Sequence, residues 1–140
     1  MSKHGPVILV DDDTDDHQVF VEVLEEMNVT NKVICFETCS DALLHLRSSS
    51  EQAFMIFCDV NMPAFSGLEF KKHIDRDIEL RKKSIPFMFF STHTQPEVVE
   101  EAYTEMTIQG FFKKPSSYDE MKALIKQIFH YWHVCRHPNS

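Results

Sequence analysis

The chain has 140 residues, which is enough for one domain and too few for a second independent hydrophobic core. Hydrophobic residues make up 43% of the chain and include twelve Phe, so a disordered chain is excluded. The formal net charge of -8 argues against nucleic-acid binding, because a nucleic-acid surface would show clustered Lys and Arg. We therefore expect a single globular domain with no nucleic-acid partner.

The N-terminal segment has no apolar stretch long enough for a signal peptide. No run approaches the length of a membrane span, which needs about eighteen apolar residues or more. The four cysteines contain no CxxC pair and lie mostly in apolar segments; they are Cys35, Cys39, Cys58 and Cys135. Such cysteines are typical of reduced core thiols in a cytosolic protein. We expect a cytoplasmic protein with no membrane partner.

The first part of the chain predicts three strands and two helices. Residues 6–10 are apolar and rich in β-branched side chains, which predicts a buried strand. Thr14 can cap a helix over residues 14–27, whose apolar side chains share one face. Residues 32–36 form the second predicted strand, and residues 40–46 the second helix. The third predicted strand, residues 54–58, is apolar on both faces and ends at Asp59.

The second part of the chain continues the alternation. It predicts helices over residues 67–80, 97–106 and 118–132, and strands over residues 86–90 and 111–112. The last helix is amphipathic. Five strands that alternate with five helices predict a parallel sheet with helices on both faces.

Polar side chains follow four of the predicted strands. The acidic run 11–13 follows the first strand, Asp59 the third, Ser91 and Thr92 the fourth, and Lys113 and Lys114 the fifth. In open parallel sheets, ligands bind beyond the carboxyl ends of the strands, where the strand order reverses. We therefore expect these side chains to form one site.

Carboxylates gathered in one place repel one another, and their pKa values rise unless a cation is present. Hard oxygen ligands suit Mg²⁺, which commonly binds one or two carboxylates together with phosphate oxygens. A lysine and a hydroxyl in the same place add a positive charge and a hydrogen-bond donor for a phosphoryl group. An Asp carboxylate can itself attack phosphorus and form an acyl phosphate.

These residues resemble the signature of the receiver domain of two-component response regulators. The motifs are Val10-Asp11-Asp12, Asp59-Val60-Asn61-Met62-Pro63 with Gly67, Phe90-Ser91-Thr92, and Lys114-Pro115. The resemblance covers about residues 6–132 and implies one receiver domain over residues 1–140 with a short tail, 133–140. The chain also resembles the stand-alone, chemotaxis-regulator-like receivers of bacteria. The implied fold is the flavodoxin-like, doubly wound (βα)5 fold with strand order 2-1-3-4-5.

The resemblance implies a role for each site residue. Asp59 would accept a phosphoryl group from a histidine kinase or phosphotransfer protein. Mg²⁺ would be held by Asp12 directly, by Asp11 through water, by Asp59 and by the backbone carbonyl of Asn61. Ser91 would move to the phosphoryl oxygen and Lys114 would pair with it. The Lys114-Pro115 peptide is expected to be cis, as it is in family members.

The resemblance also implies modulatory residues. Phe111 stands where many receivers carry a Tyr. Because Phe has no hydroxyl, Phe111 could respond to phosphorylation only by a change in its packing. Thr92 stands where the family often has Ala or Gly, which narrows access to Asp59. Asn61 and His93 would flank the path of the attacking water, and we hypothesise that His93 modulates hydrolysis; the alternative is an exposed loop histidine. The signal would leave through residues 97–126, to a downstream protein or a second copy.

Several alternatives remain open at this point. The chain can be a pseudo-receiver scaffold that is never phosphorylated. A haloacid-dehalogenase-type phosphatase would need a second Asp two residues after the nucleophile, where Asn61 stands. An EF-hand starting at Asp11 would need Gly where Asp16 stands. Asp15 and Asp16 can be ordinary helix N-terminal acids. No enzyme activity is expected beyond the protein's own phosphotransfer and dephosphorylation.

The C-terminal tail combines histidines with a cysteine, as some metal sites do. The residues are His130, His133, Cys135 and His137. Only the first two are one helical turn apart, so we expect a solvated chain end and not a metal site.

Overall fold

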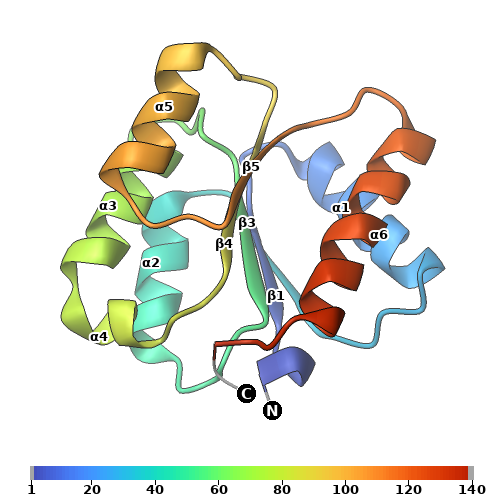
Figure 1. Cartoon of the computed structure of the whole chain (residues 1–140), viewed down its shortest axis with the longest axis horizontal. Coiled ribbons are helices and arrows are strands. Elements are labelled where there is room, and N and C mark those ends of the chain that lie inside the picture. The colour runs from blue at the N-terminus through green and yellow to red at the C-terminus, as the bar shows by residue number, and fades with distance from the viewer. Residues whose placement is uncertain (1, 139–140) are drawn as a thin grey trace.

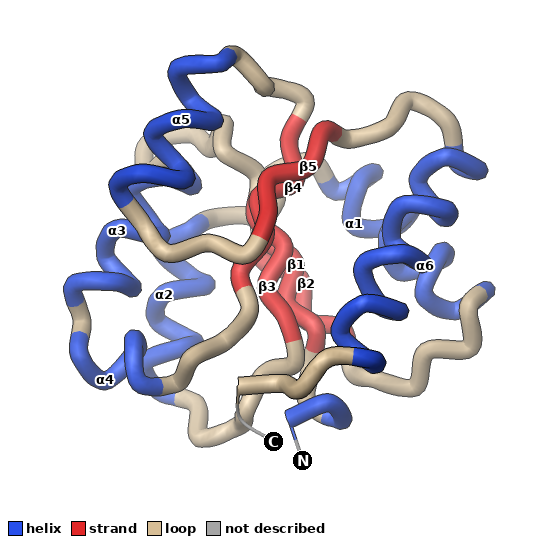
Figure 2. Tube along the Cα trace, in the orientation of Figure 1, coloured by secondary structure: helices blue, strands red, loops and turns tan. Residues whose placement is uncertain are grey.

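Five parallel strands run through the centre of the molecule in the order β2-β1-β3-β4-β5 (Figures 1 and 2). The computed structural model describes residues 2–138. The strands are β1 (Val7–Val10), β2 (Val33–Phe36), β3 (Met55–Cys58), β4 (Phe87–Ser91) and β5 (Gly110–Lys113). This order confirms the expected flavodoxin-like, doubly wound sheet.

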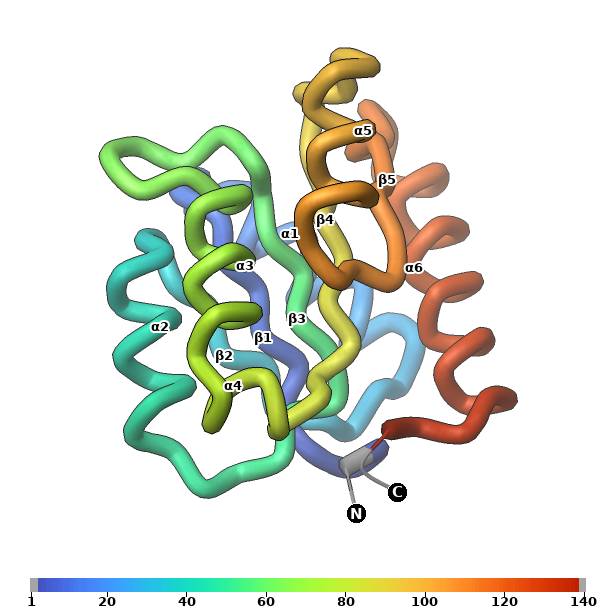
Figure 3. Tube along the Cα trace, turned by 60° about the vertical axis from the view of Figure 1, so that its left-hand side comes forward, coloured from blue at the N-terminus to red at the C-terminus, as the bar shows by residue number. Residues whose placement is uncertain are grey.

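Helices cover both faces of the sheet. The α-helices are α1 (Thr14–Glu26), α2 (Cys39–Ser48), α3 (Gly67–Arg76), α4 (Ile78–Lys82), α5 (Pro96–Glu105) and α6 (Tyr118–Val134), preceded by a 3-10 turn, η1 (Ser2–His4). Helices α1 and α6 lie on one face, and α2 to α5 lie on the other (Figures 1 and 3). None of the helices within residues 2–138 is long and apolar enough to cross a membrane.

Each central strand contributes side chains to two hydrophobic cores, because successive side chains of a strand point to opposite faces of the sheet. In β1, Ile8 and Val10 pack on the α2–α5 side, while Val7 and Leu9 pack on the α1–α6 side. Strands β3 and β4 alternate in the same way, and Phe57 is fully buried. Burial of one such side chain contributes about 2–3 kcal/mol. This packing holds the carboxyl ends of the strands rigidly in register.

Asp side chains set helix boundaries that differ from those expected. The N-cap of α1 is Asp13, whose carboxylate accepts a hydrogen bond from the Asp15 backbone, and Thr14 is the first helical residue instead of the cap. The predicted helix 67–80 is broken at Asp77, which has extended backbone angles and caps α4 through its carboxylate. Asp competes for backbone N–H groups in this way and so favours helix starts over helix interiors. The described residues therefore form six α-helices where five were predicted.

The C-terminal tail is anchored at His137, so the expectation of a solvated tail is wrong for this residue, whereas Arg136 and Pro138 are exposed and residues 139–140 lie outside the described structure. His137 is 1% exposed, and its Nε2 lies 2.8 Å from the carbonyl oxygen of Phe54. Its ring packs against the rings of Phe54 and Trp132. Lys3 donates hydrogen bonds to the carbonyls of His133 and Cys135, which joins the two ends of the chain. The buried imidazole gains apolar contacts and keeps a hydrogen bond, so its burial carries no unpaired polar group.

Candidate functional site

Three carboxylates meet beyond the ends of the central strands. Val10 of β1 pairs with Cys58 of β3, so the residues that follow them, Asp11 and Asp59, are neighbours. The backbone N–H of Asp59 donates to the carbonyl of Val10 (2.9 Å). Asp11 is 1% and Asp59 8% exposed, whereas Asp12 is exposed. One oxygen from each of these three carboxylates lies within 4.8 Å of the others.

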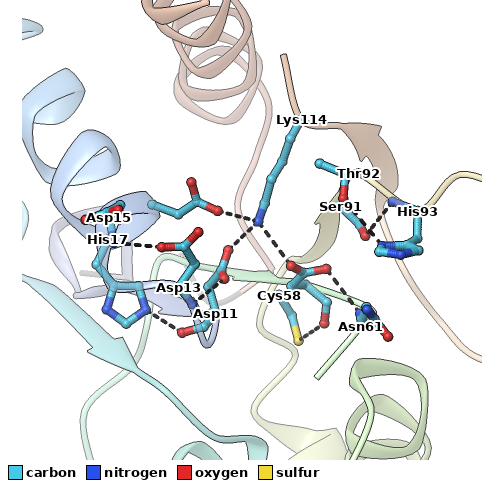
Figure 4. A network of polar contacts seen from close by, with 12 residues as sticks. Asp11, Asp13, Asp15, His17, Cys58, Asn61, Ser91, Thr92, His93 and Lys114 are labelled. Carbon is cyan, nitrogen blue, oxygen red and sulfur yellow. Dashed lines mark hydrogen bonds and ion pairs between the residues drawn. The ribbon is translucent and has the colours of Figure 1, made fainter. Parts of the chain in front are cut away.

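Lys114 supplies the positive charge that holds this cluster together (Figure 4). Its Nζ contacts Asp11 Oδ2 closely, and it lies 3.1 Å from Asp59 Oδ2 and 2.8 Å from Asp16 Oδ2. Its backbone N–H donates to the carbonyl of Ser91 (2.9 Å), which extends the β4–β5 ladder and fixes where the side chain starts. The ammonium group thereby bridges three carboxylates from three different segments.

Burial and the neighbouring charges shift the pKa values of Asp11 and Lys114. Burial raises the pKa of Asp11, and its hydrogen bond with Lys114 only partly offsets that effect. Burial alone would lower the pKa of Lys114, but the hydrogen bonds to Asp11 and Asp16 and the nearby carboxylate charges raise it strongly. Lys114 therefore stays protonated at any physiological pH, while Asp11 is the carboxylate that burial penalises.

Backbone contacts fix the loop that follows β3. Asp59 Oδ1 accepts a hydrogen bond from the Asn61 N–H (3.1 Å), and the Gly67 N–H donates to the Val60 carbonyl (2.9 Å). Gly67 packs directly on the backbone of Asp59, because a Cβ at this position would lie 2.1 Å from the Asp59 carbonyl oxygen. Helix α3 therefore starts in contact with the residue that carries the central carboxylate.

Ser91 is the last residue of β4, and Thr92 and His93 follow it in a short turn (Figure 4). Ser91 is fully buried, and its Oγ accepts a hydrogen bond from the backbone N–H of His93 (3.0 Å). Thr92 and His93 are exposed, with 3.4 Å between Thr92 Oγ1 and His93 Nδ1. The structure thus places the Ser91 hydroxyl beside β3 and β5, but engaged with its own turn rather than with Asp59 or Lys114.

Phe111 lies within β5, and Pro115 directly follows Lys114 after the end of that strand. The Phe111 ring packs against Phe89, and its backbone N–H donates to the hydroxyl of Tyr103 (3.0 Å). The Lys114-Pro115 peptide is not cis, because residues 2–138 contain no cis peptide bond. A cis peptide is not needed to direct Lys114 toward the carboxylates. Its backbone is fixed by the hydrogen bond to Ser91, and its long side chain reaches Asp59 from there.

Two contributors to the site were not predicted. Asp16 was interpreted as an ordinary acid at a helix start, but its carboxylate binds Lys114. The only sequence signal for this was its place in the first helical turn after the acidic loop, which brings its side chain back toward the end of the sheet. Tyr103 had no signal, because its contact with Phe111 depends on how α5 packs beside β5.

Comparisons with known proteins agree with this geometry. The chain is 24% identical over 130 residues to the chemotaxis protein CheY-3 of Vibrio cholerae, covering 92% of this chain and 95% of that protein. Its fold is similar to that of a phosphorylated cyanobacterial phytochrome response regulator, RcpA (TM-score 0.86, 22% identity, 96% and 99% of the two chains).

A second similar structure is the receiver domain of a Pseudomonas aeruginosa sensor histidine kinase, with magnesium coordinated in its active-site cleft (TM-score 0.72, 16% identity, 91% and 95% of the two chains). The family model of the response regulator receiver domain matches residues 7–126, which include all five strands and every residue of the carboxylate cluster. The chain therefore belongs to the response regulator receiver domain family, whose members are phosphorylation-switched signalling domains.

Proposed function

We propose that Asp59 is the phosphoacceptor of this receiver and that the donor is a histidine kinase or a phosphotransfer protein. The observation that carries the proposal is the position of the Asp59 carboxylate, which lies in a shared cluster with Asp11 and Asp12 and is hydrogen-bonded to Lys114. In the transfer, an Asp59 oxygen attacks phosphorus. The O–P bond forms as the P–N bond of the phosphohistidine breaks, and the electron pair leaves with the donor imidazole.

The donor set fits Mg²⁺, because it consists of carboxylate oxygens that converge within 4.8 Å. Asp11, Asp12 and Asp59 would hold the ion, with the backbone carbonyl of Asn61 as a further ligand. When bound, the ion would neutralise charge on the carboxylates and on the incoming phosphoryl group. The magnesium-coordinated Pseudomonas receiver of similar fold supports this assignment.

The chain's own residues would orient and stabilise the phosphoryl group. Lys114 already contacts Asp59 and would pair with a phosphoryl oxygen after transfer. Ser91 would exchange its hydrogen bond with the His93 backbone for one to the phosphoryl group. That exchange would release the turn after β4, and it is the step that we propose couples phosphorylation to the surface.

The signal would leave through the face formed by α5, β5 and α6, toward a downstream protein or a second copy of the chain. This face exposes Tyr103 (53%) and Tyr131 (61%). A groove of about 350 Å³ lies beside Tyr131 and is lined by Phe112 and Leu124. Phe111 has no hydroxyl to report the change, so we propose that its ring packing and its backbone contact with Tyr103 do so.

His93 and Thr92 would tune how long the phosphoryl group survives. Both side chains are exposed at the rim of the site, and Asn61 lies on the opposite loop. We expect His93→Ala to change the lifetime of the phosphoryl group, because an imidazole at the rim can hydrogen-bond to the attacking water. The same phosphate lifetime in the wild type and in His93→Ala would rule His93 out.

The proposal is tested by incubating the protein with Mg²⁺ and acetyl phosphate and reading its intact mass. We expect a gain of one phosphoryl unit in the wild type and in Asp15→Asn, a control on an exposed acid in the first turn of α1. Asp59→Asn should show no gain. Labelling of Asp59→Asn would move the acceptor elsewhere, and no labelling of the wild type would favour a pseudo-receiver scaffold.

A further inference from the structure

A cavity of about 260 Å³ lies at the opposite end of the sheet from Asp59, next to α4 and the start of β4. Its walls come from α3, α4, the start of β4 and the segment between α5 and β5. The charged side chains that line it are Lys71, Asp75, Arg81 and Lys83. Three cations and one carboxylate thus line a single cavity in a chain whose net charge is -8. The ammonium group of Lys83 donates hydrogen bonds to the carbonyls of Leu46 and Ser49, so Lys71 and Arg81 are the cations considered below.

Lys71 is a buried, pre-positioned cation in this cavity. The residue is 6% exposed, and its Nζ lies 2.8 Å from Asp75 Oδ1 and 5.2 Å from the centre of the Phe87 ring. Burial lowers its pKa, although the hydrogen bond to Asp75 opposes that effect. A lysine held in this way has little side-chain entropy left to lose when a ligand binds.

The one carboxylate of the cavity is already occupied. Asp75 accepts hydrogen bonds from Lys71, from the backbone N–H of Thr107 (2.9 Å) and from the Thr107 hydroxyl (2.9 Å). Within the described part of the chain, Arg81 forms no ion pair with an acidic residue. Arg81 lines the cavity and is also exposed, so its guanidinium lies where the cavity meets solvent, with no carboxylate of the described residues paired to it.

The size of the cavity limits what it can hold. An apolar cavity of about 150 Å³ is large enough to bind benzene, so about 260 Å³ admits a ring with one charged group. Nucleotides and other drug-sized ligands need roughly 300–1,000 Å³. Ile56, Ile74 and Leu80 provide apolar walls for the ring.

We propose that this cavity is a second binding site, separate from the phosphorylation site, for a small organic monocarboxylate. The carboxylate contacts Arg81, because a guanidinium can bind a carboxylate through two parallel hydrogen bonds. Lys71 lies behind it as the second cation, and the apolar part of the ligand packs against Ile74 and Leu80.

The test uses the full ¹⁵N-labelled chain, with benzoate as the probe and benzamide as its neutral counterpart, at pH 7 and constant ionic strength. We expect benzoate to cause saturable amide shifts at Ile85 and Gln109, which line the cavity. Benzamide should bind at least about tenfold more weakly, because the charge-assisted hydrogen bond is lost.

Two variants separate the cavity from general surface charge. Arg81→Gln should weaken benzoate binding about tenfold or more. Lys82→Gln removes an exposed neighbouring charge that does not line the cavity and should leave the affinity unchanged. Absence of saturable shifts, equal binding of benzamide, or equal loss in Lys82→Gln and Arg81→Gln would each overturn the proposal.

Discussion

Gly67→Ala tests whether the close contact between α3 and the backbone that follows β3 positions Asp59. A Cβ at this position would lie 2.1 Å from the Asp59 carbonyl oxygen and 3.0 Å from Val60 Cα. A carbon and a carbonyl oxygen need roughly 3.3 Å, so the two backbones must separate by about 1 Å. Neither contact is with a flexible side chain, so no rotamer change can relieve the overlap.

Two effects of the added methyl group compete. Overpacking of this kind costs about 1–3 kcal/mol or more, whereas replacing Gly by Ala in a helix gains at most about 1 kcal/mol, and less at the first helical position. The overpacking cost therefore prevails, and we expect a net loss of about 2 kcal/mol in the free energy of unfolding. A displacement of about 1 Å at a reacting group can cost on the order of 100-fold in rate, so phosphorylation of Asp59 should slow by a similar factor.

The assay combines urea unfolding at equilibrium with the rate of mass gain from acetyl phosphate. Gly110→Ala is the matched control, because its Cβ would meet the side chain of Phe112 at 2.6 Å, away from Asp59. That ring can move, so the cost should be about 1 kcal/mol with a near-normal rate of phosphorylation. A Gly67→Ala protein with the unfolding midpoint and phosphorylation rate of the wild type would refute the reasoning.

Three further predictions concern charged groups. Mg²⁺ should raise the Tm of the wild type and raise it much less in Asp12→Asn, because the ion binds only the native cluster; equal shifts would exclude Asp12 as a ligand. Asp16→Asn should lower the free energy of unfolding by about 1 kcal/mol, since its half-exposed carboxylate binds Lys114, while Asp15→Asn should change it little; equal losses in urea unfolding would contradict this. Burial lowers the pKa of His137, so the folded chain resists its protonation and stability should fall as the pH drops below the ordinary histidine range, about 6.5. His137→Gln should flatten that fall in thermal melts between pH 7 and 5, and an unchanged profile would argue against it.

The central strands could be predicted because they are apolar on both faces. Residues 54–58 show this best, since a short run that is apolar throughout predicts a strand buried on both faces, and Met55–Cys58 is that strand. The cluster could be predicted because Asp11, Asp59 and Lys114 each follow a strand, and parallel strands end together. Local pattern and sheet geometry were sufficient here.

Contacts between distant segments could not be predicted. The expectation of a solvated tail was wrong at His137, because the carbonyl of Phe54 that binds this residue lies 83 residues away in the chain. The helix break at Asp77 had a local cause, since Asp favours caps, but the apolar periodicity on either side concealed it. The position of Asp16 over Lys114 required the angle between α1 and the sheet, which residue spacing does not give.

The single ammonium group of Lys114 has a consequence for the order in which partners can enter the site. Asp11, Asp12, Asp16 and Asp59 bring four carboxylates to one positive charge, which leaves an excess of three negative charges when all are ionised. A phosphoryl donor is itself anionic and is repelled by that excess, whereas a divalent cation is attracted and removes most of it. Electrostatics would therefore favour binding of the cation before binding of the phosphoryl donor. Added salt should slow cation binding, because it screens the attraction. In the absence of the cation, salt should make donor binding easier, because it screens the repulsion.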